Sequence, residues 1–269
     1  MFRSVRRISF ATAVASLLVA STSANVGHIV SVNVVDGGMT QNGTYLAALH
    51  LTLAEGWKTY WRVPGDAGIP PSFNWRGSRN VAATRFTWPT PDVFDQNGIR
   101  SIGYENELVL PVEITPQNAK TPVRIKGRMD LGICGDVCIP ASIRFDETLD
   151  PDADRSPAIV AALSQRPFSE TEAGVQDALC RITPTDSGLR IEVRITMPSA
   201  GEREVAVIEP GNPKVWASEP ETARHGGVLI AASDLVHVEQ TGYVIDRSKV
   251  RITVLGSSHA VDIQGCAAD

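Results

Sequence analysis

Apolar and polar residues alternate along several short stretches of the chain. The alternating positions are Leu49, Leu51 and Leu53; Val123, Ile125, Gly127, Met129 and Leu131; Ile191, Val193, Ile195 and Met197; and Val250, Ile252 and Val254. A period of two is typical of strands with one buried face, and Gly, Pro, Asn or Asp bounds each stretch. Many short strands separated by such turn residues predict an all-β protein with an antiparallel sandwich.

One stretch predicts a helix. Ser156 is a preferred N-cap, Pro157 suits the first helical position, and the apolar run AIVAALSQ follows. The acidic segment LDPDADRSP precedes this helix, and four of the five tryptophans lie before it. We therefore expect a first β-rich domain over residues 25–150 and a linker with a short helix over 151–170. A second β-rich domain follows over 171–269, and a second sandwich is one option for its fold.

The first 24 residues have the three parts of a secretory signal peptide. Arg3, Arg6 and Arg7 are followed by the apolar residues 8–20, and then by small residues up to Ala24. About 13 apolar residues are too few to cross a hydrocarbon core of about 30 Å, so we expect cleavage near Ala24 and export to an oxidising compartment. The Arg6-Arg7 pair leaves general secretory and twin-arginine export both open.

Composition excludes several classes of protein. The chain has 269 residues, of which 43% are hydrophobic and 20% are charged, and this excludes collagen, coiled coils and low-complexity disorder. The formal net charge is −5, which gives no electrostatic basis for binding phosphate backbones. We expect no nucleic-acid partner.

The four cysteines Cys134, Cys138, Cys180 and Cys266 allow three disulfide pairings. In the chain-entropy model, a Cys180–Cys266 bridge closes a long loop and contributes about 4.6 kcal/mol, whereas a Cys134–Cys138 bridge contributes about 2 kcal/mol. The distant pair is the better structural disulfide. The close pair is a candidate redox couple, with a local staple on a hairpin as the alternative.

A Cys134–Cys138 bridge requires the three residues between the cysteines to turn back. Residues four apart in a strand have Cα atoms roughly 13 Å apart, but bridged cysteines need about 4.4–6.8 Å. Gly135 supplies conformational freedom for such a turn. Metal binding is a further alternative, but no His lies near this pair and the five histidines show no ligand spacing, so we expect no metal.

Four ordered blocks of the sequence resemble the N-terminal periplasmic domain of the DsbD thiol:disulfide interchange family, including its ScsB-like branch. They are GWKTYWRVPGDAGIPPSFNW (residues 56–75), FTWPTPDVF (86–94), IGYENELVLPVEI (102–114) and LGICGDVCIP (131–140). The resemblance covers roughly residues 27–150. Four blocks in order are far more specific than one cysteine pair.

The resemblance implies an immunoglobulin-like domain in which Cys134 and Cys138 form the redox-active pair. In the family, this domain takes electrons through a membrane domain and passes them to periplasmic disulfide isomerases or other oxidised proteins. An aromatic cap loop shields the pair, and residues 92–99 with Phe94 are the nearest equivalent here. Tyr60, Trp61 and Tyr104 are further candidates to line the site, with core packing as the alternative for each.

Two features depart from the family. The chain has neither the multi-helix membrane domain nor the thioredoxin-like domain, so we expect a stand-alone secreted protein that uses a separate membrane donor of the DsbD, ScsB or CcdA type. The second half, with the structural pair Cys180 and Cys266, matches no motif of the family, and its role is open.

The resulting hypothesis is a periplasmic thiol:disulfide oxidoreductase, a protein-disulfide reductase that needs no cofactor because sulfur carries both electrons. One alternative is a non-catalytic binding module with two structural disulfides. Another is a copper-handling protein, because the ScsB-like branch is associated with copper tolerance. The sequence leaves open the donor, the client, the reduction potential, the oligomeric state and which of Cys134 and Cys138 attacks.

Overall fold

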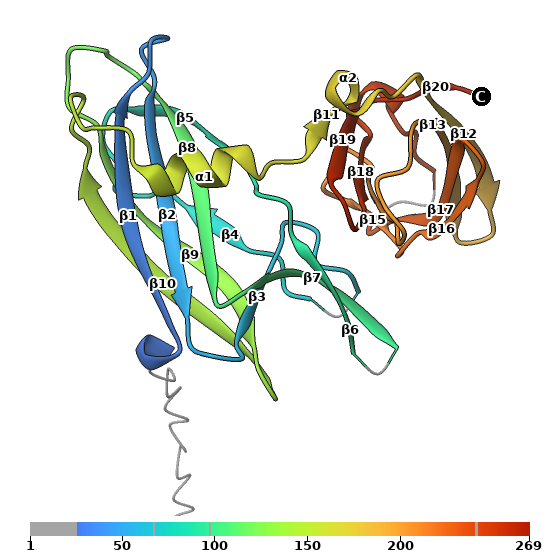
Figure 1. Ribbon diagram of the computed structural model, residues 1–269, viewed down its shortest axis with the longest axis horizontal. Helices are drawn as coiled ribbons and strands as arrows, with labels where there is room; N and C mark the ends of the chain where they lie inside the picture. The colour runs from blue at the N-terminus through green and yellow to red at the C-terminus, as the bar shows by residue number, and fades with distance from the viewer. Residues whose placement is uncertain (1–25, 67, 97, 240–241) are drawn as a thin grey trace, which may run out of the picture.

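The computed structural model describes residues 26–66, 68–96, 98–239 and 242–269 (Figure 1). The predicted signal peptide, residues 1–24, lies outside the described residues. None of the described helices has the length and hydrophobicity of a membrane-spanning segment.

The first half of the chain forms two antiparallel sheets. One has the strand order β1 (Val30–Met39), β2 (Tyr45–Leu53), β8 (Glu107–Pro116) and β5 (Val81–Phe86). The other has the order β10 (Cys138–Thr148), β9 (Arg124–Cys134), β3 (Lys58–Tyr60), β7 (Ile99–Glu105) and β6 (Asp92–Gln96), and β4 (Ser72–Asn74) also pairs with β9. A short 3₁₀ helix, η1 (Val26–His28), precedes β1.

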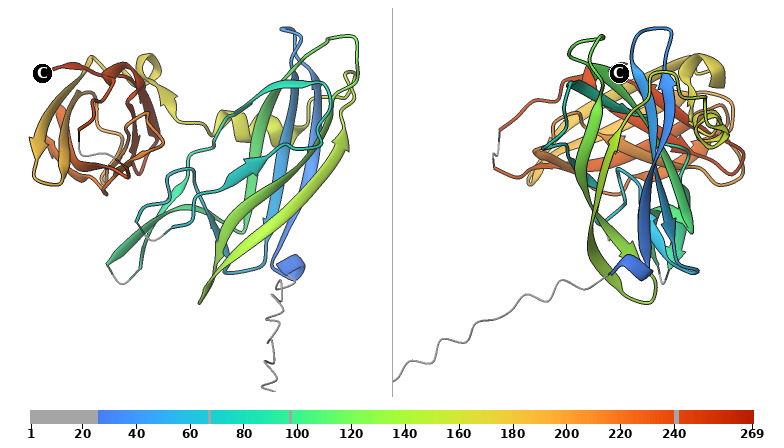
Figure 2. Two further views of the ribbon diagram at one scale, coloured as in Figure 1. Left: turned by 180° about the vertical axis from the view of Figure 1, so that it is seen from behind. Right: turned by 90° about the vertical axis from the view of Figure 1, so that its left-hand side faces the viewer.

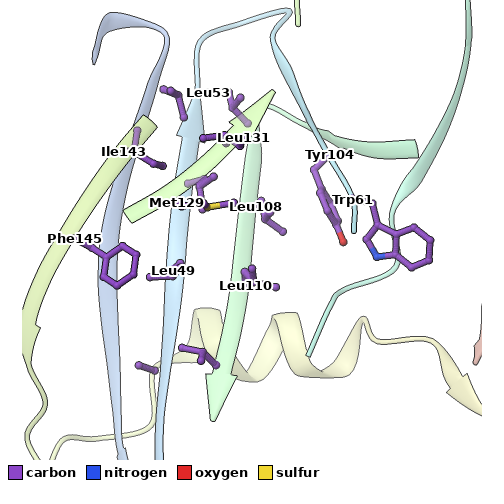
Figure 3. Close-up of a cluster of buried hydrophobic side chains, with 14 of the residues drawn as sticks. Leu49, Leu53, Trp61, Tyr104, Leu108, Leu110, Met129, Leu131, Ile143 and Phe145 are labelled. Carbon is purple, nitrogen blue, oxygen red and sulfur yellow. The ribbon is translucent and has the colours of Figure 1, made fainter. Parts of the chain in front are cut away.

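The predicted alternation fills the core of this first sandwich. Leu49, Leu51, Ile125 and Met129 are fully buried, and Leu131 is 2% exposed. Figure 3 shows these strands meeting across the core, with side chains from both sheets in one cluster. The period-two alternation of apolar residues therefore leads to an all-β sandwich, because each strand buries one face against the opposite sheet.

The second half of the chain forms two further sheets. One has the order β11 (Phe168–Ser169), β19 (Ala260–Gln264), β18 (Arg251–Leu255) and β14 (Val205–Glu209). The other has the order β15 (Val215–Ala217), β17 (Val228–His237), β13 (Gly188–Thr196), β12 (Asp177–Thr185) and β20 (Ala267–Ala268), and β16 (Glu221–His225) also pairs with β17. The pairs β11–β19 and β12–β20 are parallel. The remaining small elements are α2 (Glu170–Ala173) and η2 (Arg247–Lys249).

The predicted helix is α1 (Pro157–Ser164), which begins at Pro157 as expected. Ser156 occupies the N-cap position, although its side chain makes no capping hydrogen bond. The helix is not a free linker, because its buried Ile159 packs with Leu46 and Ala48 on the outside of the first sandwich. Strand β10 is the last strand in the sheets of the first half, and β11 is the first in the sheets of the second half. The division into domains at residues 150–170 stays a prediction.

The two sandwiches lie side by side, joined by the segment that carries α1 and α2 (Figures 1 and 2). The buried core cluster of the first sandwich extends to Val207, Leu255 and Ala260 of the second. Among the described residues, two ion pairs also connect the sandwiches: Arg62, just after β3, pairs with Glu209, and Arg100 on β7 pairs with Glu219. The contact is therefore partly apolar and partly ionic.

Candidate functional site

The close cysteine pair lies at the end of a hairpin. Cys134 is the last residue of β9 and Cys138 is the first residue of β10, and the two face each other in register. They form a disulfide with a Cα–Cα distance of 4.1 Å. The Gly135 N–H donates to the Val137 carbonyl at 3.1 Å, which closes the turn that the spacing required.

The two cysteines differ in exposure. Cys134 is 2% exposed, whereas Cys138 is an exposed residue beside Val137, which is 61% exposed. An external thiol can therefore approach the Cys138 side of the bond, while the Cys134 side is covered. This asymmetry is the main chemical feature of the site.

Tyr60 is the predicted aromatic residue that contacts the disulfide. Its hydroxyl lies 2.8 Å from Cys134 Sγ and 3.4 Å from Cys138 Sγ, and it is the donor because a disulfide carries no proton. Tyr60 is 4% exposed, and burial raises the pKa of its phenol. The hydroxyl therefore keeps its proton at neutral pH and remains available as a donor.

Small residues make room for the Tyr60 ring. A Cβ added to Gly132 would lie 2.9 Å from carbons of the Tyr60 ring and 2.8 Å from Ile69 Cβ. A Cβ added to Gly68 would lie 2.9 Å from ring carbon Cδ1. The ring thus lies against Gly132 of β9 through Cδ2 and Cε2 and against Gly68 through Cδ1, and Ile69 lies beside Gly132.

Lys58 lies directly opposite Cys134 on the neighbouring strand β3. It pairs with Cys134 on β9 and with Glu105 on β7, and side chains directly opposite each other share one face of a sheet. Lys58 is 8% exposed, and its Nζ lies 4.7 Å from the centroid of the Phe94 ring. The described contact of Phe94 is therefore with the Lys58 ammonium group, which lies on the same face of the sheet as Cys134, and not with a sulfur atom.

Trp61 and Tyr104, the other two aromatic candidates, pack with the core of the first sandwich. Trp61 is completely buried, and the Tyr104 hydroxyl donates to the Pro89 carbonyl at 2.8 Å on the core side of the sheet. Figure 3 shows both with the buried cluster. Trp61 directly follows β3 and packs in the core cluster with Tyr104, whereas the Tyr60 hydroxyl contacts the disulfide.

Sequence reasoning missed three residues near the site. Lys58 could have been found, since it lies two positions before Tyr60 and a strand places both on one face. Trp57 approaches the turn, with ring carbon Cε2 3.2 Å from a Cβ added to Gly135, and it belongs to the aromatic block that carried the resemblance. Ile69 lies in a loop, and no periodicity marks it.

The distant pair forms the second disulfide. Cys180 on β12 is fully buried and bonds to Cys266, which follows β19, with a Cα–Cα distance of 5.7 Å. The bridge joins the beginning and the end of the second sandwich. No group of three or more His, Cys, Asp or Glu side chains in the described residues is arranged to hold a metal ion.

Two comparisons with known proteins agree with this architecture. Residues 32–150 match the family model described as thiol:disulfide interchange protein DsbD, N-terminal. The structure is similar to the crystal structure of the N-terminal periplasmic domain of ScsB from Proteus mirabilis, with a TM-score of 0.68 and 20% identity. The match covers 90% of this chain and 94% of that chain, so it includes the second sandwich as well as the first. No curated protein matches the chain.

These findings confirm the all-β, immunoglobulin-like fold and the predicted family resemblance. At 20% identity the structural match concerns the fold alone.

Proposed function

Because residues 32–150 match the DsbD N-terminal family, we propose that this chain exchanges disulfides with partner proteins through Cys134 and Cys138. The observation that carries the proposal is the asymmetric disulfide, with Cys138 exposed and Cys134 buried against the Tyr60 hydroxyl. A disulfide that serves only as a staple needs neither an accessible sulfur nor a donor aimed at the other.

Electron uptake begins with a donor thiolate that attacks Cys138 Sγ. A bond forms between the donor sulfur and Cys138, the Cys134–Cys138 bond breaks, and Cys134 leaves as a thiolate. The donor's second thiolate then attacks the mixed disulfide and releases Cys138. Two electrons have passed to this chain, the donor has become a disulfide, and the two released thiolates take up protons according to their pKa values.

Electron delivery is the same sequence in reverse. The Cys138 thiolate attacks an oxidised client, and Cys134 then attacks Cys138 Sγ and releases the reduced client. Cys138 is thus the cysteine that bonds to partners, and Cys134 is the resolving cysteine. No cofactor takes part in either direction.

Tyr60 stabilises the charge that develops on Cys134 during electron uptake. Its hydroxyl already points at Cys134 Sγ at 2.8 Å, and a hydrogen bond to a charged sulfur is stronger than one to a neutral sulfur. The donor is placed before the reaction, as in other sites where fixed dipoles face developing charge. Lys58, directly opposite Cys134, adds a positive charge to this face.

The partners follow from the same premise. We assign the protein to the periplasm, where a membrane-linked protein with a reduced cysteine pair would donate electrons and an oxidised protein would accept them. The similar structure from Proteus mirabilis is that of a periplasmic domain, which supports this location. The activity is that of a protein-disulfide reductase.

Two single-cysteine variants test the assignment. Cys134→Ser leaves Cys138 free, and Cys138→Ser leaves Cys134 free. With glutathione disulfide as the probe, we expect Cys134→Ser to form a mixed disulfide at least about tenfold faster than Cys138→Ser, because the Cys134 sulfur is covered. Intact-protein mass spectrometry measures both rates. Equal rates, or a faster Cys138→Ser variant, would contradict the assignment.

A further inference from the structure

Arg62, two residues beyond Tyr60, is bound by the second sandwich. Its Nη2 donates to Glu209 Oε2 at 2.9 Å and to Thr253 Oγ1 at 3.1 Å, and its Nε lies 3.2 Å from both Glu209 oxygens. The guanidinium also lies 3.9 Å from the centroid of the Trp61 ring. The Arg62 and Glu209 side chains are 13% and 25% exposed, so this is a mostly desolvated, two-pronged ion pair.

The segment after Tyr60 is short and returns to the Tyr60 ring. The Trp61 N–H donates to the Ile102 carbonyl, and the Ile102 N–H donates to the Pro64 carbonyl, so the chain is tied to β7 on both sides of Arg62. A few residues later, Gly68 packs against the ring that contacts the disulfide. Arg62 therefore anchors the segment that both follows Tyr60 and encloses it.

A second link acts on the neighbouring strand. Arg100 on β7 forms an ion pair with Glu219 of the second sandwich at 2.5 Å. The carbonyl of Arg100 also lies 2.9 Å from the position of a Cβ on Gly65, so the strand and the segment are in close contact. Both the Tyr60 segment and the strand beside it are thus attached to the second sandwich, beside the apolar contacts of Val207 and Leu255.

We propose that the second sandwich is a positioning device for the redox site: through Glu209 and Thr253 it holds Arg62, and through Arg62 it fixes the Tyr60 hydroxyl against Cys134 Sγ. This inference rests on the proposed function and deepens it. It gives a role to the half of the chain that carries no redox motif. Arg62 and Glu209 are positioning residues, since neither touches sulfur.

The chemical consequence concerns the attack on Cys138. When an external thiolate bonds to Cys138 Sγ, the Cys134–Cys138 bond breaks and Cys134 leaves with the electron pair of that bond. A fixed Tyr60 donor lowers the barrier to this step, whereas a donor that must first be ordered contributes less. Loss of the Arg62–Glu209 contact should therefore slow reduction without altering the cysteines or the tyrosine.

A double-mutant cycle between Glu209 and Tyr60 tests the proposal. Dithiothreitol is the probe, because a small dithiol needs no docking surface, and alkylation with mass spectrometry follows the Cys134–Cys138 pair. We expect Glu209→Ala to slow reduction about fivefold, and Glu209→Gln, which keeps one accepting oxygen, to lie between that variant and the unchanged protein. In the Tyr60→Phe background, Glu209→Ala should have no further effect, because the hydroxyl that it positions is gone.

Asp146→Ala is the matched control. It breaks another two-pronged ion pair, with Arg124, in the same sheet as the disulfide but at the far end of the β9–β10 ladder. In this variant, dithiothreitol should reduce the Cys134–Cys138 disulfide at the same rate as in the unmutated protein. Two results would show that the second sandwich does not position Tyr60. One is an unchanged rate of disulfide reduction in Glu209→Ala. The other is a double variant whose slowing equals the product of the slowing in Glu209→Ala and in Tyr60→Phe.

Two further measurements distinguish a folding defect, and a failure of the proposed function, from a failure of the positioning proposal. If Glu209→Ala fails to give the circular dichroism spectrum of the folded protein, Thr253→Val replaces it, with an expected slowing of about twofold that again disappears with Tyr60→Phe. An unchanged rate in that variant would overturn the proposal. If the unmutated folded protein is not reduced by dithiothreitol at Cys134–Cys138, the proposed function fails, which is a different outcome from an unaltered Glu209 variant.

Discussion

The two disulfides of this molecule occupy opposite kinds of environment. Cys134–Cys138 spans a turn of one hairpin, and its second cysteine is exposed. Cys180–Cys266 joins segments 86 residues apart, and Cys180 is fully buried. The first disulfide adds little constraint to the chain, because its two strands are already paired in register. The second closes most of a sandwich.

This contrast indicates that placement rather than bond type separates the two expected roles. A bond that closes a short loop contributes little to stability, so it can open and close without unfolding the domain. Such a bond becomes useful for exchange when one sulfur is accessible and a donor faces the other. In the first sandwich, the donor is the Tyr60 hydroxyl at 2.8 Å from Cys134 Sγ.

Cys138→Ser should have the most severe consequence for exchange. Without the accessible sulfur, neither a donor nor a client can form the mixed disulfide, so transfer of electrons to an oxidised protein should fall to the background rate. The melting temperature should change by only a few degrees, because the closed loop is short. Assays of disulfide reduction and thermal unfolding measure the two quantities; residual exchange above background would show that another sulfur takes part.

Cys180→Ser should produce the converse result. Removal of the long-range bridge should destabilise the second sandwich by about 2–5 kcal/mol, whereas exchange at Cys134–Cys138 should continue below the new melting temperature. Calorimetry under otherwise identical conditions measures the loss. The buried bridge would have no structural role if the melting temperature stayed the same.

Tyr60→Phe tests the contribution of one hydroxyl to the exchangeable disulfide. The ring remains and the fold should be retained, but the Cys134 thiolate loses its donor, so reduction by dithiothreitol should slow at least about tenfold. Tyr45→Phe is a useful control, since Tyr45 is a buried tyrosine of β2, in the other sheet of the same sandwich. A rate equal to that of the unmutated protein in Tyr60→Phe would remove the hydroxyl from the mechanism.

A much weaker effect is expected at the far end of the same hairpin. Hydrogen bonds from Arg124 and Lys126 lower the pKa of Asp146 to about 2, below its ordinary value of 3.8. A lowered carboxyl pKa stabilises the folded protein above pH 3.8, and this contribution is lost as the pH falls through about 2. Asp146→Ala should therefore lower the urea midpoint slightly at pH 6, by less near pH 2 and not at all well below pH 2, with exchange unaffected; a difference that stays constant down to low pH would point to another cause.

Much of the fold could be predicted from the sequence. The period-two runs around Leu51, Met129, Val193 and Ile252 became buried strands, and the Ser156-Pro157 pair marked the start of α1. The all-β class followed from these patterns because burial of one strand face is a local property. The attachment of α1 to the outside of the first sandwich and the parallel pairs near the C-terminus depend on contacts between distant segments, which periodicity does not encode.

The site was only partly predictable for the same reason. Spacing and resemblance identified Cys134 and Cys138, and the aromatic block pointed to Tyr60. The aromatic block does not separate Tyr60, whose hydroxyl contacts the disulfide, from Trp61, which directly follows β3 and packs in the core. The contact between Arg62 and Glu209 joins residues 147 positions apart, so only the folded chain connects the second sandwich to the segment beside the Cys134–Cys138 disulfide.

A glutathione redox titration of the folded protein, with thiol trapping and peptide mass spectrometry to follow each bridge separately, tests the division of roles between the two disulfides. We expect Cys134–Cys138 to open reversibly at a potential well above about −300 mV while Cys180–Cys266 stays closed. If both bridges resist reduction below that range, the close pair is a staple. The molecule would then be a binding module rather than an electron carrier.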